Sequence, residues 1–275
     1  MRIYVSIDME GIAGVVRSDH TSTAGRDYNL ARKWMTKELS VVVDEALKNG
    51  VEYILVNDSH GGMTNLLLDE LPEGNIEVIT GSLKPLIMME GIQLGFNAAF
   101  FIGYHSKKGT RGGILDHTVF GRAFRRVVIN NREASEFYLN ALIAGHYNTP
   151  VVLLSGDDKI AKEAQETIDG IEVVVTKYGI SRYSARHLTK SLLYRRLREA
   201  TQRALEKADK VKPLKISYPV KIEIEFTDSS LADAAELIPI FNRIDAMSIE
   251  YKARDMVEAV KLIEALCLIS SAVLK

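Results

Sequence analysis

Short apolar runs alternate with longer amphipathic stretches over the first two thirds of the chain. Strand-like runs rich in β-branched residues lie at positions 2–8, 53–58, 76–81, 98–105, 125–131, 151–156 and 171–176. Helix-like stretches between them cover residues 26–50, 134–148 and 157–168. This alternation is typical of an α/β fold in which helices cover a largely parallel sheet.

The pattern changes near Ser181. Residues 184–211 indicate one charged helix without a neighbouring strand, and the remainder of the chain predicts strand, helix, strand, helix. The segment KIEIEF (221–226) alternates polar and apolar residues, as a strand with one wet face does. We therefore expect a mostly parallel sheet flanked by helices over residues 1–180. A helical connection and a smaller C-terminal α/β subdomain are expected over residues 181–275.

Composition narrows the classes of function. The chain has 275 residues, and 35 Lys and Arg balance 36 Asp and Glu, so no overall basic field predicts nucleic-acid binding. No apolar run approaches the roughly 18 residues that span a bilayer, and the first residues lack the pattern of a signal peptide. The single cysteine, Cys267, is expected to be a small buried apolar side chain. We expect a cytoplasmic protein without membrane or nucleic-acid partners.

Three of the most apolar strands end in polar residues that a core does not need. Asp8 and Glu10 follow the first run, His60 follows the second, and His105 ends AAFFIGYH. Functional groups in open α/β sheets gather beyond the carboxyl ends of the strands. Residues i and i+2 of an extended chain point to the same side, so Asp8 and Glu10 can converge. Two such carboxylates repel each other, and a divalent cation would offset that repulsion.

Two carboxylates and two imidazoles suit zinc, and also manganese, cobalt or iron, better than calcium or magnesium. The spacing is not a compact motif such as HExxH, and a single Asp or His at a strand end is more often a cap, turn or surface residue. Glu136 could supply a fifth ligand, because it shares a helical face with Leu139 and Ile143. Glu133 lies near the helix start, where the helix dipole alone favours an acid. Both glutamates stay open on this evidence.

The Gly-rich segment at residues 106–121 contains His117 beside Asp116. A histidine here could transfer protons in hydrolysis, although most loop histidines are exposed residues without a chemical role. The segment does not match a phosphate-binding P-loop. The remaining histidines have no comparable setting and are expected to be surface or structural residues; they are His20, His146 and His187.

Five segments, in this order along the chain, resemble the DppA-type D-aminopeptidases, a family of zinc metallopeptidases. The segments are SIDMEG (6–11), VNDSH (56–60), GSLKPLIMMEG (81–91), GYH (103–105) and INNREASEFYLNALIAGHY (129–147). The most specific of them is the pattern Ser-x-Asp-x-Glu-Gly from Ser6 to Gly11. The similarity runs over residues 1–180 and continues through VKPL (211–214) into the C-terminal part.

The resemblance implies two zinc ions in each active site and a catalytic role for His117. The loop before His117 is one residue longer here than in the family pattern. The metal-binding residues of the family fall on Asp8, Glu10, His60, His105 and Glu136, with Asp8 as the bridging ligand. The family also forms rings, so the resemblance implies a homo-oligomer, with a decamer of two stacked pentamers as one form.

The activity that the resemblance implies is hydrolysis of short peptides by zinc-activated water, with a preference for N-terminal D-residues such as D-Ala. His117 would stabilise the oxyanion or donate a proton to the leaving amine. Other functions stay open. The same site could serve an L-aminopeptidase or a small-amide amidase, its ligand types also suit a two-metal phosphatase or phosphodiesterase, and the protein could bind a metal or ligand without catalysis.

Overall fold

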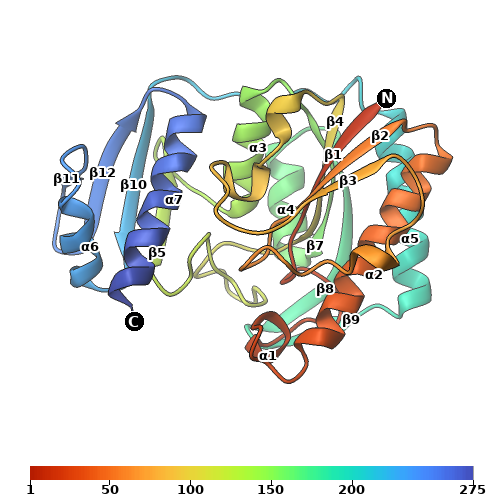
Figure 1. Ribbon diagram of the computed structural model, residues 1–275, viewed down its shortest axis with the longest axis horizontal. Helices are drawn as coiled ribbons and strands as arrows, with labels where there is room; N and C mark the ends of the chain where they lie inside the picture. Colours follow the sequence, from red (N-terminus) through yellow and green to blue (C-terminus); the bar gives the residue numbers. More distant parts are fainter. Residues whose placement is uncertain (275) are drawn as a thin grey trace.

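The computed structural model describes residues 1–274 and contains two β-sheets (Figure 1). The larger sheet consists of β1 (Arg2–Ile7), β2 (Tyr53–Asp58), β3 (Ile76–Ile79), β4 (Ala98–Tyr104), β7 (Val151–Asp157), β8 (Glu172–Ser181) and β9 (Ser184–His187). Its strands lie in the order β3-β2-β1-β4-β7-β8-β9. All neighbours pair in parallel except β8 and β9, which are antiparallel. The expected α/β fold with a mostly parallel sheet is confirmed.

Helices cover both faces of this sheet. They are α2 (Tyr28–Lys48), α3 (Glu136–His146), α4 (Asp158–Thr167) and α5 (Lys190–Glu206), while the short α1 (Ser18–Thr21) contacts α2. α2 and α5 pack together on one face, and α3 and α4 lie on the other (Figure 1). Every residue of β4 and β7 is therefore buried, which explains their unbroken apolar runs. Across residues 1–274, every helix is too short or too polar to serve as a bilayer span.

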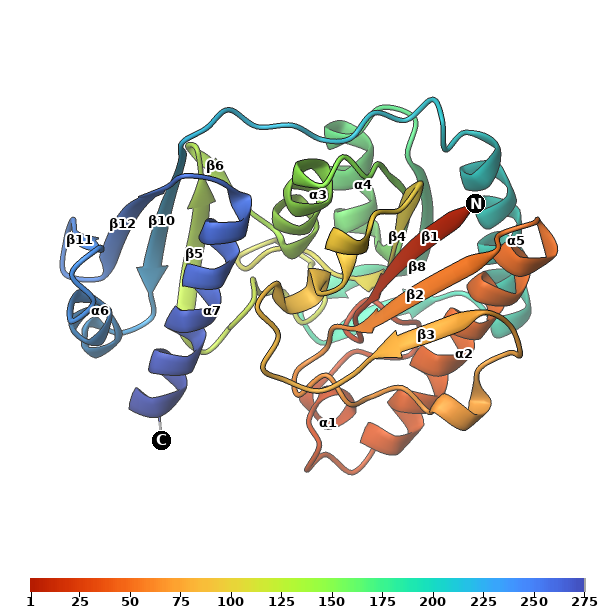
Figure 2. The same ribbon diagram turned by 45° about the horizontal axis from the view of Figure 1, so that its top comes forward.

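The smaller sheet is antiparallel and carries the C-terminal helices. Its strands are β5 (Phe124–Ile129), β6 (Arg132–Glu133), β10 (Val220–Phe226), β11 (Asn242–Arg243) and β12 (Ser248–Ala253), in the order β11-β12-β10-β5-β6. α6 (Ser229–Glu236) and α7 (Met256–Val273) pack on it. α7 also contacts α3, so it lies where the two sheets meet (Figure 2). Buried and half-buried residues alternate along β10, as expected for a strand with one wet face.

The strand pairing divides the chain differently from the expected boundary between residues 180 and 181. β5 and β6 lie within the expected main domain, yet they join the second sheet, where β5 pairs with β10. α5 packs on the larger sheet, and the expected helix at 184–211 is shorter because its first four residues form β9. Periodicity predicts that a segment is a strand but not which distant strand it joins. The expectation that all strands before residue 181 belong to the main sheet is therefore wrong for β5 and β6. The division of the chain into two domains itself stays a prediction.

Candidate functional site

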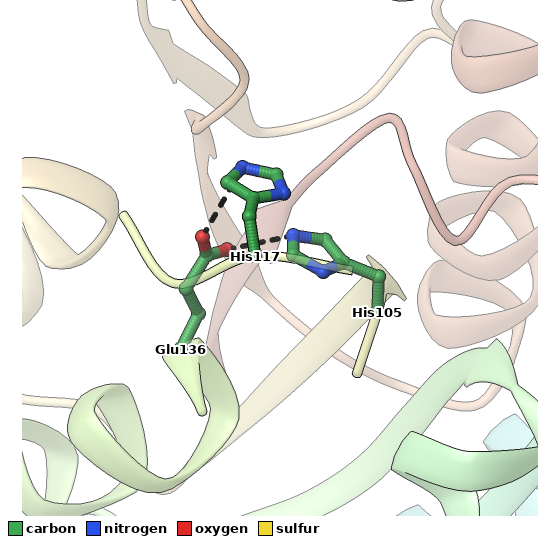
Figure 3. A group of neighbouring side chains, drawn as sticks. All are labelled: His105, His117 and Glu136. Carbon is green, nitrogen blue, oxygen red and sulfur yellow. Dashed lines mark ion pairs between the residues drawn. The ribbon is translucent and has the colours of Figure 1, made fainter. Parts of the chain in front are cut away.

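Strands β2, β1 and β4 are neighbours, so their carboxyl ends meet at one edge of the larger sheet. Six side chains that the sequence analysis selected come together there, in two groups of three. One group is Asp8, Glu10 and His60, and the other is His105, His117 and Glu136 (Figure 3). Within each group, one potential ligand atom from every residue lies within 4.8 Å of the others. Five of the six residues are buried, and His117 is half-buried.

Two glycines allow the ends of β1 and β4 to approach each other closely. The Gly11 amide donates a hydrogen bond to the Gly103 carbonyl at 2.7 Å. A Cβ atom on Gly11 would lie 2.0 Å from the Tyr104 carbonyl oxygen, and Gly103 has a φ of +70°, which favours glycine. This backbone contact holds the loop that carries Asp8 beside the strand that leads to His105.

Glu136 enters the cluster from the first turn of α3. Ser135 caps this helix through its side chain, so the Glu136 carboxylate projects from the helix start toward the imidazoles. Its Oε2 lies 3.2 Å from His105 Nε2, and its Oε1 lies 3.6 Å from His117 Nε2 (Figure 3). The positive end of the helix dipole favours an acid at this position.

Two other acids near these segments are engaged elsewhere. Glu133 is exposed and forms an ion pair with Lys107 at 2.9 Å, so Glu136 is the glutamate that lies in the cluster. Asp58 is the last residue of β2, and its carboxylate accepts hydrogen bonds from the Asn65 side chain at 2.7 Å and the Leu66 amide at 2.8 Å. Its carboxylate holds the turn after β2 and is not directed at the cluster.

Each of the three imidazoles donates one ring N–H to a backbone carbonyl. The pairs are His60 Nε2 with Thr21 at 2.8 Å, His105 Nδ1 with Ser106 at 2.9 Å, and His117 Nδ1 with Leu115 at 2.9 Å. Because a carbonyl oxygen only accepts, these bonds fix the tautomer and leave a lone pair on the inward nitrogen of each neutral ring. The same arrangement is common among histidines that bind metals.

The inward nitrogens of these rings face carboxylate oxygens. His60 Nδ1 lies 2.8 Å from Glu10 Oε2 and 3.3 Å from Asp8 Oδ1. His105 Nε2 lies 3.5 Å from Asp8 Oδ2. Within residues 1–274, Asp8 Oδ2, Glu10 Oε2 and His105 Nε2 have no partner with hydrogen-bond geometry. Lone pairs and negative oxygens repel each other at these distances, so the arrangement requires a proton or another cation between them.

The pKa values show how strongly the cluster attracts positive charge. Burial and the neighbouring Glu10 charge raise the pKa of Asp8 to about 7. Burial alone would lower the pKa of His105, but the Glu136 carboxylate outweighs it and raises that pKa to about 10. Burial also opposes a charged His60, yet the Glu10 and Asp8 carboxylates hold its pKa well above the usual value. Protons and a metal ion would therefore compete for the same positions.

His117 differs from the other two imidazoles because its pKa is lowered, first by burial and then by the charge of His105. The two rings stack with their centroids 4.2 Å apart. A neutral His117 can either donate its Nε2 lone pair to a metal or accept a proton there. The geometry is compatible with both roles, so its catalytic assignment stays a prediction.

The loop that carries His117 is fixed by Asp116 and Arg182. Arg182 Nη1 donates to the Asp116 carbonyl at 2.6 Å and also to its Oδ1, and the Asp116 Oδ2 accepts from the Gly109 amide at 2.6 Å. The Leu115 amide donates to the Arg182 carbonyl at 3.0 Å. These contacts hold the segment before His117 against the turn between β8 and β9. Sequence reasoning missed Arg182, because nothing in the local pattern pairs it with residue 116.

Lys177 holds the loop that follows β1. Its side chain is fully buried in β8, and its Nζ donates to the backbone carbonyls of Glu10, Ile12 and Val15. Three carbonyl acceptors satisfy an ammonium group without a directly bonded carboxylate. Sequence reasoning missed this residue too, although a lysine inside the apolar run VVVTKYG was an available signal.

Four other side chains bind the backbone of the same loop, and three of them come from distant segments. The contacts are Thr176 Oγ1 to the Gly11 carbonyl, the Ala13 amide to Glu38 Oε1, the Gly14 amide to His187 Nδ1, and the Val16 amide to His20 Nδ1. The loop therefore contains little regular structure but has most of its polar backbone groups satisfied. The positions of Asp8 and Glu10 rest on this network.

A cavity of about 740 Å³ opens onto the cluster, a size typical of sites for small ligands. One wall comes from α7 and includes Glu264, Cys267, Leu268 and Ser271. The expectation of a small buried apolar side chain at Cys267 holds only in part, because the residue packs against the core but is half-buried and lines this cavity. The helix α7, which carries Cys267, contacts α3 as well as the second sheet.

Comparisons with known proteins identify the family of the chain. A family model described as D-aminopeptidase matches residues 1–265. The D-aminopeptidase of Bacillus subtilis (strain 168) is 38% identical over 261 residues, which cover 94% of each chain. A solved structure described as the Zn-dependent D-aminopeptidase DppA from Bacillus subtilis, a self-compartmentalizing protease, superimposes with a TM-score of 0.94. That alignment covers 98% of both chains at 35% identity.

Proposed function

Because the chain belongs to the D-aminopeptidase family, we propose that it is a metal-dependent aminopeptidase that removes N-terminal D-residues such as D-Ala from short peptides. The observation that carries this proposal is the cluster of buried carboxylates and inward ring nitrogens at the edge of the larger sheet. The name of the solved relative, which describes a zinc-dependent enzyme, supports the choice of metal.

The residues of the cluster fit a pair of zinc ions. Asp8, Glu10 and His60 would hold one ion, while His105 and Glu136 would hold the other, with Asp8 shared between the two. Nitrogen and carboxylate donors of this kind suit zinc, and each ring is already oriented by a backbone carbonyl. The unpartnered atoms Asp8 Oδ2, Glu10 Oε2 and His105 Nε2 support this assignment.

When bound, the ions would polarise the scissile carbonyl and lower the pKa of water. The protein's own residues then determine where protons move. His117 has its Nδ1–H committed to the Leu115 carbonyl, so Nε2 is the atom that carries a proton to or from the reacting groups. Its lowered pKa keeps this nitrogen available as an acceptor at neutral pH. The Asp116–Arg182 pair keeps the ring in place during this transfer.

The test of this function is cleavage of D-Ala-D-Ala by the purified protein after zinc is restored. Cleavage that a chelator abolishes and zinc recovers is the expected result, with two zinc ions per chain by elemental analysis. No cleavage of the D-peptide would reject the proposal. The same panel includes L-Ala-L-Ala, D-alaninamide and a model phosphoester, so cleavage of one of these instead would identify the L-aminopeptidase, amidase or phosphoesterase alternative.

We also propose that the protein assembles into a ring, as a decamer of two pentamers. The support is the description of the solved relative as self-compartmentalizing, a property that requires several subunits around an enclosed space. Light scattering on the protein as it elutes from a size-exclusion column measures the molar mass of the assembly directly. A mass equal to the 30.6 kDa chain at working concentration would reject the assembly. The cytoplasmic location stays a prediction.

A further inference from the structure

Helix α7 presents one face to the cavity that contains the cluster. Glu264, Cys267, Leu268 and Ser271 all line this cavity, and offsets of three, four and seven residues place them on one side of the helix. The cavity thus has two different walls. The edge of the larger sheet supplies the buried carboxylates and imidazoles, and α7 supplies a wall from the second sheet.

Glu264 is the acid of this α7 wall, and it has no cationic partner. The other glutamate of the helix, Glu258, lies 3.8 Å from Arg254 and also accepts a hydrogen bond from the Arg254 amide. Within residues 1–274, no such ion pair or hydrogen bond engages the Glu264 carboxylate. Burial raises its pKa, and no neighbouring cation offsets that effect. A half-buried carboxylate that lines a cavity and has no internal partner is free to bind a cation that enters the cavity.

Glu264 lines the same cavity as the cluster residues Asp8, Glu10, His60, His117 and Glu136. The pKa of the Cys267 thiol is raised by burial and then by the charges of both Glu264 and Glu136. Both carboxylates therefore act on Cys267, which lines the same cavity as Glu264 and Glu136. The two arginines that line the cavity are engaged elsewhere: Arg122 donates to the Leu274 carbonyl at 3.2 Å, and Arg182 is paired with Asp116.

We propose that Glu264 binds the α-ammonium group of the N-terminal residue of the substrate. The inference rests on the proposed aminopeptidase function, since such a substrate carries a free ammonium group beside the bond that is cleaved. An ammonium group donates charge-assisted hydrogen bonds to a carboxylate and neutralises its charge. Leu268, one turn further along the same face, contacts the N-terminal side chain. Peptides with a free N-terminus are therefore preferred over peptides with a blocked one.

The experiment compares the zinc-loaded wild-type protein with Glu264→Gln, which preserves shape and removes the charge. Calorimetry measures the binding of D-alanine and of propanoate, which lacks the amine, so this readout requires no cleavage. Kinetics measure kcat and KM for D-Ala-D-Ala and for propanoyl-D-Ala. We expect wild type to prefer the amine by about 10- to 100-fold, the range of a hydrogen bond to a charged group, and the variant to lose most of this preference through KM.

Glu258→Gln is the matched control, because it makes the same change on the same helix at a carboxylate that already has a partner. It should keep the wild-type preference. The Glu264→Gln variant loses no internal contact, so its melting temperature should equal or exceed that of wild type.

Two results would overturn the ammonium site: an amine preference that persists unchanged in Glu264→Gln, or no preference in wild type. Failure of the proposed aminopeptidase function gives a different result from failure of the ammonium site. In that case wild type binds D-alanine with the expected preference, loses it on substitution, and still cleaves no peptide.

Discussion

The two sheets carry similar charged residues but surround them differently. On the second sheet, Lys221 lies 2.7 Å from Glu223 and 2.8 Å from Glu250, and all three side chains are partly exposed. At the edge of the larger sheet, Asp8 and Glu10 are buried, and the nearest groups of possible positive charge are imidazoles. Paired charges that are partly exposed are typical of a solvated surface. Buried carboxylates whose only neighbouring cations are protonated imidazoles are costly, and they indicate a site for a positively charged ligand.

The largest effect is expected at Asp8, which contacts both groups of the cluster. Asp8→Asn keeps the shape of the side chain and removes one charge, so we expect zinc to be lost. We expect kcat/KM to fall by more than the roughly 10- to 100-fold loss that follows substitution of a residue that only hydrogen-bonds to a metal ligand. In a chelator the variant should melt at a higher temperature than wild type, because repulsion of Glu10 is relieved. Elemental analysis and melting curves measure both effects. Full zinc content and full activity in the variant would show that Asp8 is not a metal ligand.

The next effect concerns His117, whose role the geometry leaves open. His117→Ala should lower kcat by about 10²- to 10⁴-fold while the zinc content stays at the wild-type level, because a proton carrier is lost and no ligand is. His146→Ala serves as the control, since its ring bonds the Tyr218 hydroxyl away from the cavity. If zinc leaves together with activity, His117 is a ligand in the group of His105 and Glu136.

A smaller but still large effect is expected at Lys177. Lys177→Met fits the apolar strand but leaves the carbonyls of Glu10, Ile12 and Val15 without their donor. We expect a loss of about 3 kcal/mol or more in the free energy of unfolding, together with weaker zinc binding. Chemical denaturation and zinc competition with a chelator measure the two quantities. Unchanged zinc affinity would show that the loop keeps its position without this ammonium group.

A pH-dependent effect is expected at Glu38, whose carboxyl is buried beside the loop. Burial raises its pKa from 4.5 to about 8 in the folded protein. Between these values the unfolded chain releases a proton that the folded protein retains, so stability falls as pH rises, by up to about 1.4 kcal/mol per pH unit. Glu38→Gln keeps an acceptor for the Ala13 amide and should remove this part of the slope. Denaturation at pH 5, 7 and 9 compares the two proteins, and parallel pH curves would contradict the raised pKa.

The smallest effect is expected on the second sheet. Lys221→Met removes a cation from between two partly exposed acids, and exposed pairs contribute only about 0–1 kcal/mol. The substitution matches Lys177→Met in chemistry and differs only in its surroundings. A change of several kcal/mol in the free energy of unfolding, or any loss of zinc, would contradict the view that charged groups on the second sheet contribute little and those at the edge of the larger sheet form the site.

Most strands of the larger sheet and part of the site could be predicted from sequence, whereas β9 lies where a helix was expected. Strand periodicity identified the apolar runs, and neighbouring parallel strands bring the polar residues at their ends together, as the positions of Asp8, His60 and His105 show. The helical face shared with Leu139 favoured Glu136. These inferences succeed because each depends on local pattern plus one general property of parallel sheets.

Other features could not be predicted because they depend on which distant segments meet. β5 has an ordinary strand pattern, but its partner β10 lies about ninety residues later, as the pairing of Ile129 with Ile222 shows. Lys177 and Glu38 support the loop after β1 from elements far along the chain. Glu264 faces the cavity only because α7 is carried there by the second sheet.

This origin of α7 has a consequence for the evolution of the protein. Asp8, Glu10, His60 and His105 follow or end strands of the larger sheet, whereas the wall that faces them belongs to α7 on the second sheet. Substitutions at the cavity-facing residues of α7 therefore leave those strands unchanged, although α7 also contacts α3, which carries Glu136. Substitutions at these cavity-facing positions, whether they arise naturally or by directed evolution, can therefore change which peptides are accepted while the residues proposed to hold the metals stay the same.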